Sequence, residues 1–339
     1  MKILNIFLFA SLLVCLYACS EKNVSSLTST ISISETGENI LESNVFIDKI
    51  DTLPLKNKGE HFSTVQAICV TDSNIYIIDK TGSIGCFNIK TGLLIKKIRK
   101  VGHGNDEYIN PVSICEDKGY LYILDFQGCA VLIYDYKLNY IDRVKLKFPA
   151  MDFVKIPDGF LFYNMNASDQ LRRIVHTNAE GVLINSFLPS EHEEDVMQTD
   201  KLFCKDNDEE TYFSDFSNNC LYKWKDDNLT SLYQIEIKKT KNKRHSSKKT
   251  ASSLDGRYIR SFVINNKIIT LFIQDGMVLA NSYNGEMIDS HSGRVQTNIP
   301  YPFFPVTSYK NNLYGIYEKT NVNNNDDVFM MLISYKIKE

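Results

Sequence analysis

The chain has 339 residues, of which 43% are hydrophobic and 23% charged, values that are ordinary for a soluble globular protein. Its formal net charge of -3 at pH 7 argues against a nucleic-acid-binding protein, because such proteins carry a clear basic excess. Tyrosine and phenylalanine are abundant, at 19 residues each, and the apolar segments are short and rich in Ile, Val, Tyr and Phe. This composition favours β-strands.

Residues 1–18 form a targeting segment rather than part of the fold. Lys2 supplies a positive charge, and the apolar stretch Ile3–Tyr17 is too short for a membrane span. The stretch ends at Ala18-Cys19, which resembles the lipobox of bacterial lipoproteins, in which a small residue precedes the lipidated cysteine. The resemblance implies acyl chains on Cys19, and two or more such chains would hold the protein on a membrane. The alternative is a secretory signal with an incidental cysteine.

Residues 19–40 are rich in Ser, Thr, Glu and Asn and poor in aromatic residues. This composition predicts a flexible, lipidated tether that joins the membrane to a folded domain over residues 41–339. We therefore expect an outer-membrane lipoprotein. The tether has no dense acidic run, so a periplasmic-facing and a surface-exposed location both remain open.

A strand–turn–strand–Asp pattern recurs along the rest of the chain. The clearest copies are NIYIID at Asn74–Asp79 and YLYILD at Tyr120–Asp125, and four looser copies follow. Their spacing of roughly 40 to 60 residues fits a four-stranded propeller blade, apart from one long insertion. The pattern predicts an all-β fold, a six-bladed β-propeller with four-stranded antiparallel blades.

The predicted strands of blade one are residues 64–70, 74–78, 83–88 and 93–97, and the later blades begin near residues 111, 151, 201, 258 and 304. Blade six has only three strands, the last at 328–337. The segment Asn44–Leu55 precedes blade one and has no partner there. Pairing this N-terminal strand into blade six would close the ring and remove open sheet edges.

The loop Gly102–Tyr108, GHGNDEY, leads into a strand that begins at Pro111 and a second strand that ends at Asp125. This arrangement resembles an NHL-type repeat, G-x-G-x-x-E-[YF]. The whole mature chain resembles the six-bladed β-propeller lipoproteins of Bacteroides-type gut bacteria, in which Pro and Gly usually stand where Asn105 and Asp106 stand here.

We assign the motif residues of this loop to structure. Gly102 and Gly104 are predicted to form a corner between blades that needs positive φ. Glu107 and Tyr108 are predicted to join neighbouring blades. A phosphate cradle is excluded because no helix and no Lys-Ser/Thr pair follow the glycines.

Oxygen-bearing residues close all six second strands. A ring of such side chains around a central channel could hold Ca²⁺ or a polar ligand. The alternative is that each side chain caps its own turn, and recurrence in every blade favours capping. These residues are Asp79, Asp125, Asn164, Asp215, Gln274 and Glu318.

Candidate ligand residues of the channel are Asp79, Asp125 and Asp215 from this ring, with His103 from the glycine loop. The segment Tyr301–Pro305 adds Tyr301 and Phe303, whose rings could line one mouth of the channel and stack on a sugar or a peptide. Packing between blades five and six is the favoured alternative for these aromatic residues.

The mature chain has six cysteines besides Cys19, three in first strands and three in third strands. First and third strands lie roughly 9–10 Å apart, beyond the limit of about 7 Å for a disulfide, so we expect free thiols. The histidines show no zinc-ligand spacing, and no G-x-S-x-G motif occurs. The basic run at residues 238–249 reads as a solvated insertion between blades four and five.

These features favour a non-enzymatic module, expected to be monomeric, over an enzyme, since no catalytic set is visible. The leading hypothesis is a membrane-anchored binding or scaffold module whose partner is an envelope protein or a glycan. It needs no cofactor, with Ca²⁺ in the central channel as the one metal considered. The second hypothesis, implied by the NHL resemblance, is a lyase or lactonase with a metal in the channel. The third, a glycan-binding lipoprotein, rests on the aromatic segment.

Overall fold

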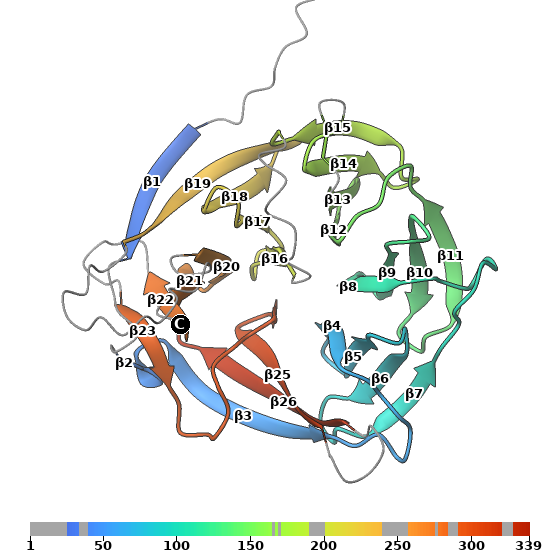
Figure 1. Ribbon diagram of the computed structural model, residues 1–339, viewed down its shortest axis with the longest axis horizontal. Helices are drawn as coiled ribbons and strands as arrows, with labels where there is room; N and C mark the ends of the chain where they lie inside the picture. Colours follow the sequence, from blue (N-terminus) through green and yellow to red (C-terminus); the bar gives the residue numbers. More distant parts are fainter. Residues whose placement is uncertain are drawn as a thin grey trace, which may run out of the picture.

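The computed structural model describes residues 26–33, 40–164, 167–168, 171–189, 201–238, 257–274, 277–283, 291–320 and 328–339. They form six β-sheets arranged as blades around a central axis (Figure 1). The predicted six-bladed β-propeller is therefore confirmed. Cys19 and most of the basic run lie outside the described residues. In the part that is described, no helix has both the length and the apolar character needed to cross a membrane.

Blades one to three are four-stranded, antiparallel and consecutive in sequence. In each, the first strand lies nearest the axis and the fourth on the rim (Figure 1). Blade one contains β4 (Val65–Val70), β5 (Asn74–Asp79), β6 (Ile84–Asn88) and β7 (Leu94–Ile98). Blade two contains β8 (Pro111–Asp117), β9 (Tyr120–Asp125), β10 (Ala130–Asp135) and β11 (Tyr140–Lys145). Blade three contains β12 (Asp152–Ile156), β13 (Gly159–Tyr163), β14 (Ile174–Asn178) and β15 (Leu183–Phe187).

Blades four and five repeat this order, and blade six borrows its outer strand from the N-terminal side of the chain. Blade four contains β16 (Phe203–Lys205), β17 (Thr211–Asp215), β18 (Cys220–Lys225) and β19 (Asn228–Ile237). Blade five contains β20 (Arg257–Ile264), β21 (Lys267–Gln274), β22 (Met277–Tyr283) and β23 (His291–Gln296). Blade six contains β24 (Thr307–Tyr309), β25 (Asn312–Thr320), β26 (Val328–Ile337) and β3 (Ile47–Leu55).

The predicted closure of the ring is confirmed by the pairing of β3 with β26. The two strands run antiparallel, with Ile47 opposite Ile337 at one end and Leu55 opposite Met330 at the other. This pairing joins a strand from the start of the fold to the last strand of the chain. It thereby completes blade six and leaves no missing strand in the ring.

Two additional strands lie on the rim, where the sequence predicted a flexible tether. β1 (Ser26–Ile33) pairs in parallel with β19, and β2 (Ile40–Glu42) pairs in parallel with β23. Residues 26–33 are thus a strand and not a linker, which corrects the prediction for that stretch. Ile31 and Ile33 are only 2% and 1% exposed, because alternate side chains of a strand share one face. The overall Ser/Thr content hid this alternation, although Thr and Ile both favour strands.

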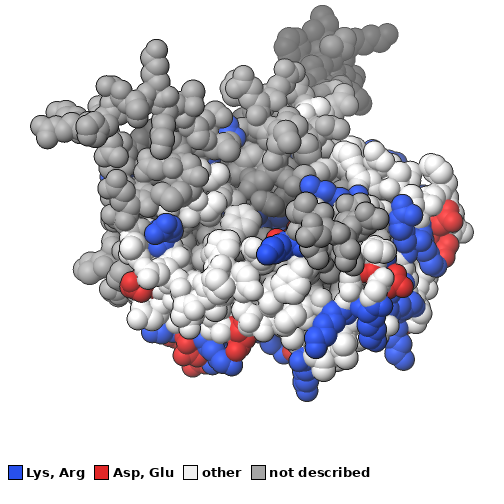
Figure 2. All heavy atoms as spheres, turned by 60° about the horizontal axis from the view of Figure 1, so that its bottom comes forward, with Lys and Arg blue, Asp and Glu red and all other residues white. Residues whose placement is uncertain are grey.

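Charged residues on the rim are mixed in sign. Figure 2 shows Lys and Arg interspersed with Asp and Glu among the described residues of one face, without a large patch of one sign. Ion pairs account for part of this mixing, such as Lys336 with Asp48 at 3.1 Å between β26 and β3. Exposed pairs of this kind contribute little to stability, so the ring depends on its apolar core.

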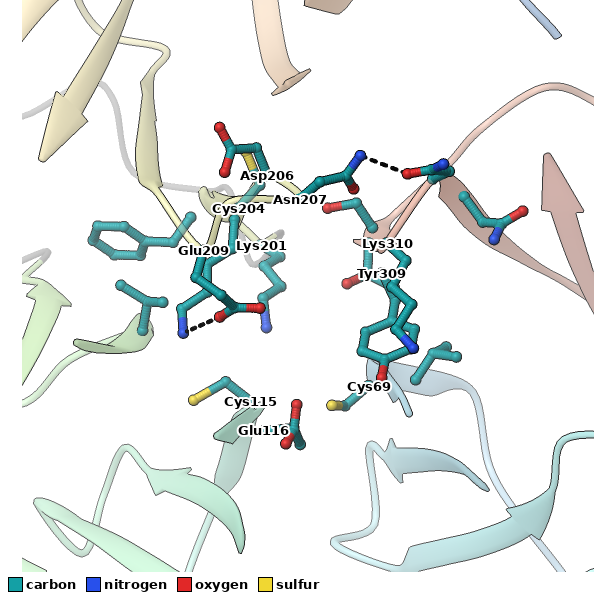
Figure 3. Close-up of a pocket in the computed structure, with 18 of the residues that line it drawn as sticks. Cys69, Cys115, Glu116, Lys201, Cys204, Asp206, Asn207, Glu209, Tyr309 and Lys310 are labelled. Atoms are coloured by element: carbon teal, nitrogen blue, oxygen red, sulfur yellow. Dashed lines mark hydrogen bonds and ion pairs between the residues drawn. The ribbon is translucent and has the colours of Figure 1, made fainter. Parts of the chain in front are cut away.

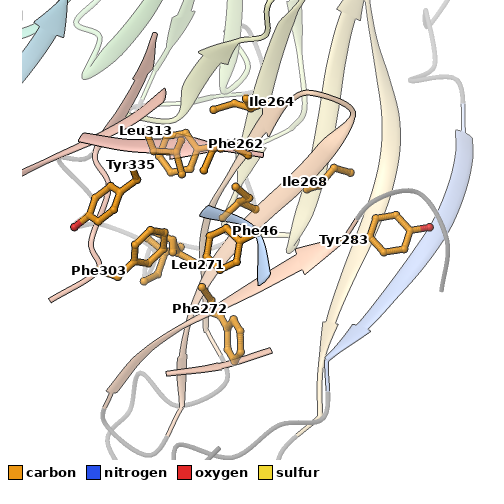
Figure 4. Close-up of a cluster of buried hydrophobic side chains, with 14 of the residues drawn as sticks. Phe46, Phe262, Ile264, Ile268, Leu271, Phe272, Tyr283, Phe303, Leu313 and Tyr335 are labelled. Atoms are coloured by element: carbon orange, nitrogen blue, oxygen red, sulfur yellow. The ribbon is translucent and has the colours of Figure 1, made fainter. Parts of the chain in front are cut away.

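The core lies between neighbouring blades. In the cluster between blades five and six, the Phe46 ring lies 5.6 Å from that of Phe303, which lies 4.8 Å from that of Tyr335 (Figure 4). Phe46 is 1% exposed and immediately precedes β3. Its burial therefore fixes the position at which the closing strand enters the ring.

Phe46→Ala is expected to lower the free energy of unfolding by roughly 3–5 kcal/mol, since it removes a fully buried aromatic side chain beside the closing strand. Urea denaturation followed by tryptophan fluorescence would measure the change. The neighbouring Val45, at 38% exposure, supplies the matched control, Val45→Ala, with an expected change of about 0.5 kcal/mol or less. Equal effects of the two substitutions would contradict this account of ring closure.

Candidate functional site

Two cavities follow one another along the innermost strands. The larger, about 780 Å³, is called the mouth cavity here, and the smaller, about 220 Å³, the rear cavity. On β4, Val65 to Ile68 border the rear cavity, whereas Cys69 and Val70 border the mouth cavity. Lys201 borders both, so it lies at the boundary between them. Side chains from blades one, two, three, four and six reach the mouth cavity.

Lys201 lies two residues before β16, the innermost strand of blade four, and is half-buried. Its Nζ donates a hydrogen bond to the carbonyl oxygen of Ile114 on β8, at 2.7 Å. Among the described residues, no carboxylate forms an ion pair with it. An ammonium group has three N–H donors, so two of them have no partner among the described residues.

The other lysines of the mouth cavity are ion-paired. Lys205 lies between Asp117, at 3.4 Å, and Glu209, at 2.9 Å. Lys310 pairs with Asp72, and Lys336 pairs with Asp48. These pairs neutralise three of the four lysines that border the cavity, which sets Lys201 apart.

Two further carboxylates border the cavity without a lysine or arginine partner among the described residues. Glu116 on β8 accepts a hydrogen bond from the Tyr136 hydroxyl at 2.6 Å. Asp206 accepts hydrogen bonds from the Tyr212 hydroxyl and from the backbone N–H of Asp208, both at 2.9 Å. Asp206 is thus held in its own turn, whereas Glu116 has one carboxylate oxygen with no hydrogen bond from a described residue.

Three cysteines from innermost strands border the same cavity. They are Cys69 on β4, Cys115 on β8 and Cys204 on β16 (Figure 3). Burial raises the pKa of the Cys69 and Cys204 thiols to about 12 and that of Cys115 to about 11. The thiols are therefore protonated and uncharged at neutral pH. All six cysteines of the described chain are free, as predicted, although Cys129 is only half-buried.

Of the predicted ring carboxylates, Asp79 and Asp125 lie in turns and border neither cavity. The Asp79 carboxylate accepts hydrogen bonds from the backbone N–H of Ser63, Thr81 and Ser83. Asp125 likewise accepts from Ile109, Asn110 and Gly128. Each carboxylate therefore caps its own turn and also holds the segment that enters its blade, in accord with the capping alternative.

Asp215 differs from these two because it forms a buried ion pair with Arg173 of blade three, at 2.6 and 3.1 Å. Of the ring positions whose side chains the structure describes, Glu318 is the one that borders the rear cavity. It accepts the backbone N–H of Val65 at 2.6 Å, and burial raises its pKa. The ring is consequently a set of separate structural contacts, with one member at the channel.

The glycine loop joins blades one and two through Tyr108. This side chain is fully buried, and its hydroxyl donates to the carbonyl of Gly82 in the β5–β6 turn at 2.8 Å. The predicted role of Tyr108 is therefore confirmed. The Glu107 carboxylate instead closes its own loop by accepting the N–H of Gly104 at 2.8 Å. His103 is exposed and borders neither cavity.

The reason predicted for the loop glycines was wrong. Neither Gly102 nor Gly104 has a positive φ. A Cβ on Gly102 would lie 2.1 Å from Oε2 of Glu107. The Glu107 carboxylate approaches the Gly102 backbone closely, so a larger residue at this position would require the flexible Glu107 side chain to move.

Tyr301 and Phe303 of the aromatic segment before blade six border neither the mouth nor the rear cavity, whereas Phe304 of the same segment borders the rear cavity. Phe303 borders a separate, largely apolar cavity of about 560 Å³ that is lined by residues of blades five and six. The Tyr301 ring lies 4.7 Å from that of Tyr317. Both residues thus pack between blades, as the alternative interpretation states.

Metal-binding side chains do not gather in the described part of the chain: no group of three or more His, Cys, Asp or Glu residues could hold an ion there. The described residues that border the mouth and rear cavities include no histidine. His176 is buried against Trp224, with ring centroids 4.9 Å apart, and burial lowers its pKa.

Lys201 and Glu116 were not predicted as site residues from the sequence. The only feature of the sequence that could have indicated them is their position in or beside innermost strands.

The mouth-cavity thiols are expected to react slowly with Ellman's reagent at pH 8, because a pKa of about 11 or 12 leaves a thiolate fraction of roughly 10⁻³ or less. In urea the same thiols should react at once. Mass spectrometry of labelled peptides would identify the sites, and half-buried Cys129 should be labelled first in the native protein. Rapid native labelling of Cys69 or Cys115 would contradict the prediction.

Comparison with solved structures finds the same fold in proteins of low sequence identity. A Bacteroides fragilis protein described as exported has a TM-score of 0.70 at 14% identity, covering 92% of this chain and 100% of that one. A member of the DUF4221 family from Bacteroides vulgatus has a TM-score of 0.50 at 10% identity, covering 86% and 97%. Virginiamycin B lyase from Staphylococcus aureus, in a catalytically inactive form with quinupristin, has a TM-score of 0.52 at 12% identity, covering 86% and 100%.

At these identities, the likeness extends to the fold alone. No curated protein sequence matches the chain. Residues 28–339 match the family described as a domain of unknown function, DUF4934. This match begins within β1 and covers both N-terminal strands and all six blades. The chain therefore belongs to the DUF4934 family.

Proposed function

We propose that this protein is a membrane-anchored binding module of the bacterial cell envelope that holds a small ligand in its mouth cavity. The observation that carries the proposal is the convergence of polar side chains from several blades on one cavity. Its volume of about 780 Å³ lies within the range of roughly 300–1,000 Å³ for small-molecule sites.

The mouth cavity has the mixed lining that ligand sites require. Phe203 and Val154 supply apolar surface, and Lys201, Glu116 and Tyr309 supply groups that can hydrogen bond. These side chains project from or beside strands with buried backbones, so their positions are set before a ligand arrives. Preorganisation of this kind lowers the entropic cost of binding.

The envelope location is supported by the targeting segment that ends at Cys19 and by the fold shared with an exported protein of Bacteroides fragilis. Lipidation of Cys19 would place the module at the outer membrane, facing the periplasm or the cell surface. A ligand in the mouth would leave the rim available to an envelope protein, so small-molecule binding and a scaffold role are compatible.

The lyase or lactonase alternative finds less support in the cavity itself. Its described lining residues include no histidine, and the raised pKa values of its three thiols keep them protonated. The glycan alternative rested on Tyr301 and Phe303, which pack between blades instead. A binding module without catalysis is therefore the function that this geometry favours.

Ser308→Trp tests the location of the site, since Ser308 borders the mouth cavity on β24 and an indole there would occupy it. Ser186→Trp on β15, at the rim, is the matched control. A panel of periplasmic amino acids, peptides and sugars would be screened by thermal shift, and hits measured by calorimetry. Ser308→Trp should weaken binding at least about tenfold and Ser186→Trp should not. A hit that binds both variants equally would place the site elsewhere.

Cys19→Ala is expected to abolish membrane attachment, because acyl chains on that residue would be the anchor. Cells fed an alkyne fatty acid would be fractionated and the protein examined for label. The wild type and a Cys129→Ala control should be labelled and sediment with membranes, whereas Cys19→Ala should be neither labelled nor sedimented. Persistent membrane attachment of Cys19→Ala would overturn the anchoring proposal.

A further inference from the structure

The mouth cavity has one cation, Lys201, and two carboxylates, Glu116 and Asp206, that form no ion pair with a described residue. Lys201 has a backbone carbonyl as its partner, and Glu116 has a tyrosine hydroxyl. The lysines at Lys205, Lys310 and Lys336 are each ion-paired, and Asp206 is engaged by its own turn. One cation and one anion are thus left with capacity for a further partner.

Lys201 and Glu116 lie in the same region of the cavity. Burial is the main cause of the raised pKa of the Cys69 thiol. Both charged groups also act on this thiol: Lys201 lowers its pKa and Glu116 raises it. Figure 3 shows the two side chains beside Cys69 and Cys115. They are nevertheless too far apart to form an ion pair with each other, since no contact within 4.0 Å joins them.

A pair of separated, half-buried, opposite charges is complementary to a zwitterion. A partly desolvated ammonium attracts a carboxylate more strongly than an exposed one does, because low-dielectric walls focus the field. For the same reason, the partly desolvated carboxylate of Glu116 attracts an ammonium group more strongly than an exposed carboxylate does. A neutral ligand would leave both charges without partners, and a ligand with a single charge would leave one.

The uncharged part of the wall fits such a ligand as well. The thiols of Cys69, Cys115 and Cys204 are protonated, so they do not compete for Lys201 as anions. Phe203 and Tyr309 offer apolar surface for a side chain. Amino acids and short peptides combine both charges with side chains of this kind.

We propose that the mouth cavity binds a free amino acid or a short unblocked peptide, with the ligand carboxylate on Lys201 and its α-ammonium group on Glu116. This inference rests on the proposed function and specifies its ligand class. The separation between Lys201 and Glu116 decides the length of the ligand, so a single amino acid and a dipeptide are the two ligands to compare.

Calorimetric titration with alanine, with Ala-Ala, and with Ala-Ala that is N-acetylated or C-terminally amidated would test the pairing. The free dipeptide or amino acid should bind, and blocking either end should weaken binding at least about tenfold. Lys201→Met should make amidation harmless while acetylation still costs affinity. Glu116→Gln, which keeps the hydrogen bond from Tyr136, should do the reverse.

Lys225→Met and Glu180→Gln are the controls, since both residues are exposed and far from the innermost strands in the blade order. They should leave every affinity unchanged. Melting temperatures would show whether each variant is folded. If Lys201→Met does not fold, Lys201→Arg, which keeps the charge, should retain the cost of amidation.

The outcomes separate this inference from the proposed function. Equal binding of free and blocked dipeptides, or effects of the two variants that do not follow their assigned ends, would overturn the zwitterion inference. If neutral compounds then bind in a way that Ser308→Trp abolishes, the binding-module proposal stands. If no compound shows binding that Ser308→Trp weakens, both proposals fail.

Discussion

The pairing of β3 with β26 is the contact on which the other features of this propeller depend. It joins residues nearly 300 positions apart in sequence, from Ile47 opposite Ile337 to Leu55 opposite Met330. Without it, blade six would have only three strands and the two ends of the fold would not be joined. The mouth cavity would also lose its form, because its wall includes residues 307–312 and Lys336 of blade six beside strands of blades one to four. Closure therefore creates the site as well as the fold.

The distribution of carboxylates follows from the repeat. Asp79 and Asp125 are used to hold turns and blade entries, and Asp215 to hold Arg173 of the neighbouring blade. Buried carboxylates are costly unless hydrogen bonds or ion pairs compensate them, and each of these three is compensated. The side chains that can serve a function are thus those that do not recur from blade to blade. Lys201 and Glu116 are such side chains, since no other described lysine or glutamate at the mouth cavity has the same contacts.

The period of the strands made the fold predictable, together with the blade boundaries and the closing strand. Local alternation was sufficient for blades one to five, because the four strands of each blade are consecutive in sequence, and the three strands left for blade six then indicated the N-terminal strand as its fourth. The site was harder to predict, because it depends on which residues face the axis once segments from five blades meet. Lys201 contacts Ile114, 87 positions away in sequence, and no local pattern predicts that contact. Gly102 and Gly104 show a second limit of prediction from the sequence. Their spacing was recognised, but the close approach of the Glu107 side chain could be seen only in the structure.

The attachment of β1 to β19 bounds how far the ring can stand from a membrane. Only residues 20–25 separate Cys19 from Ser26, where β1 begins on the rim of blade four (Figure 1). Seven peptide steps span at most about 25 Å when fully extended. With a lipid on Cys19, the rim of blade four would be held near the lipid headgroups.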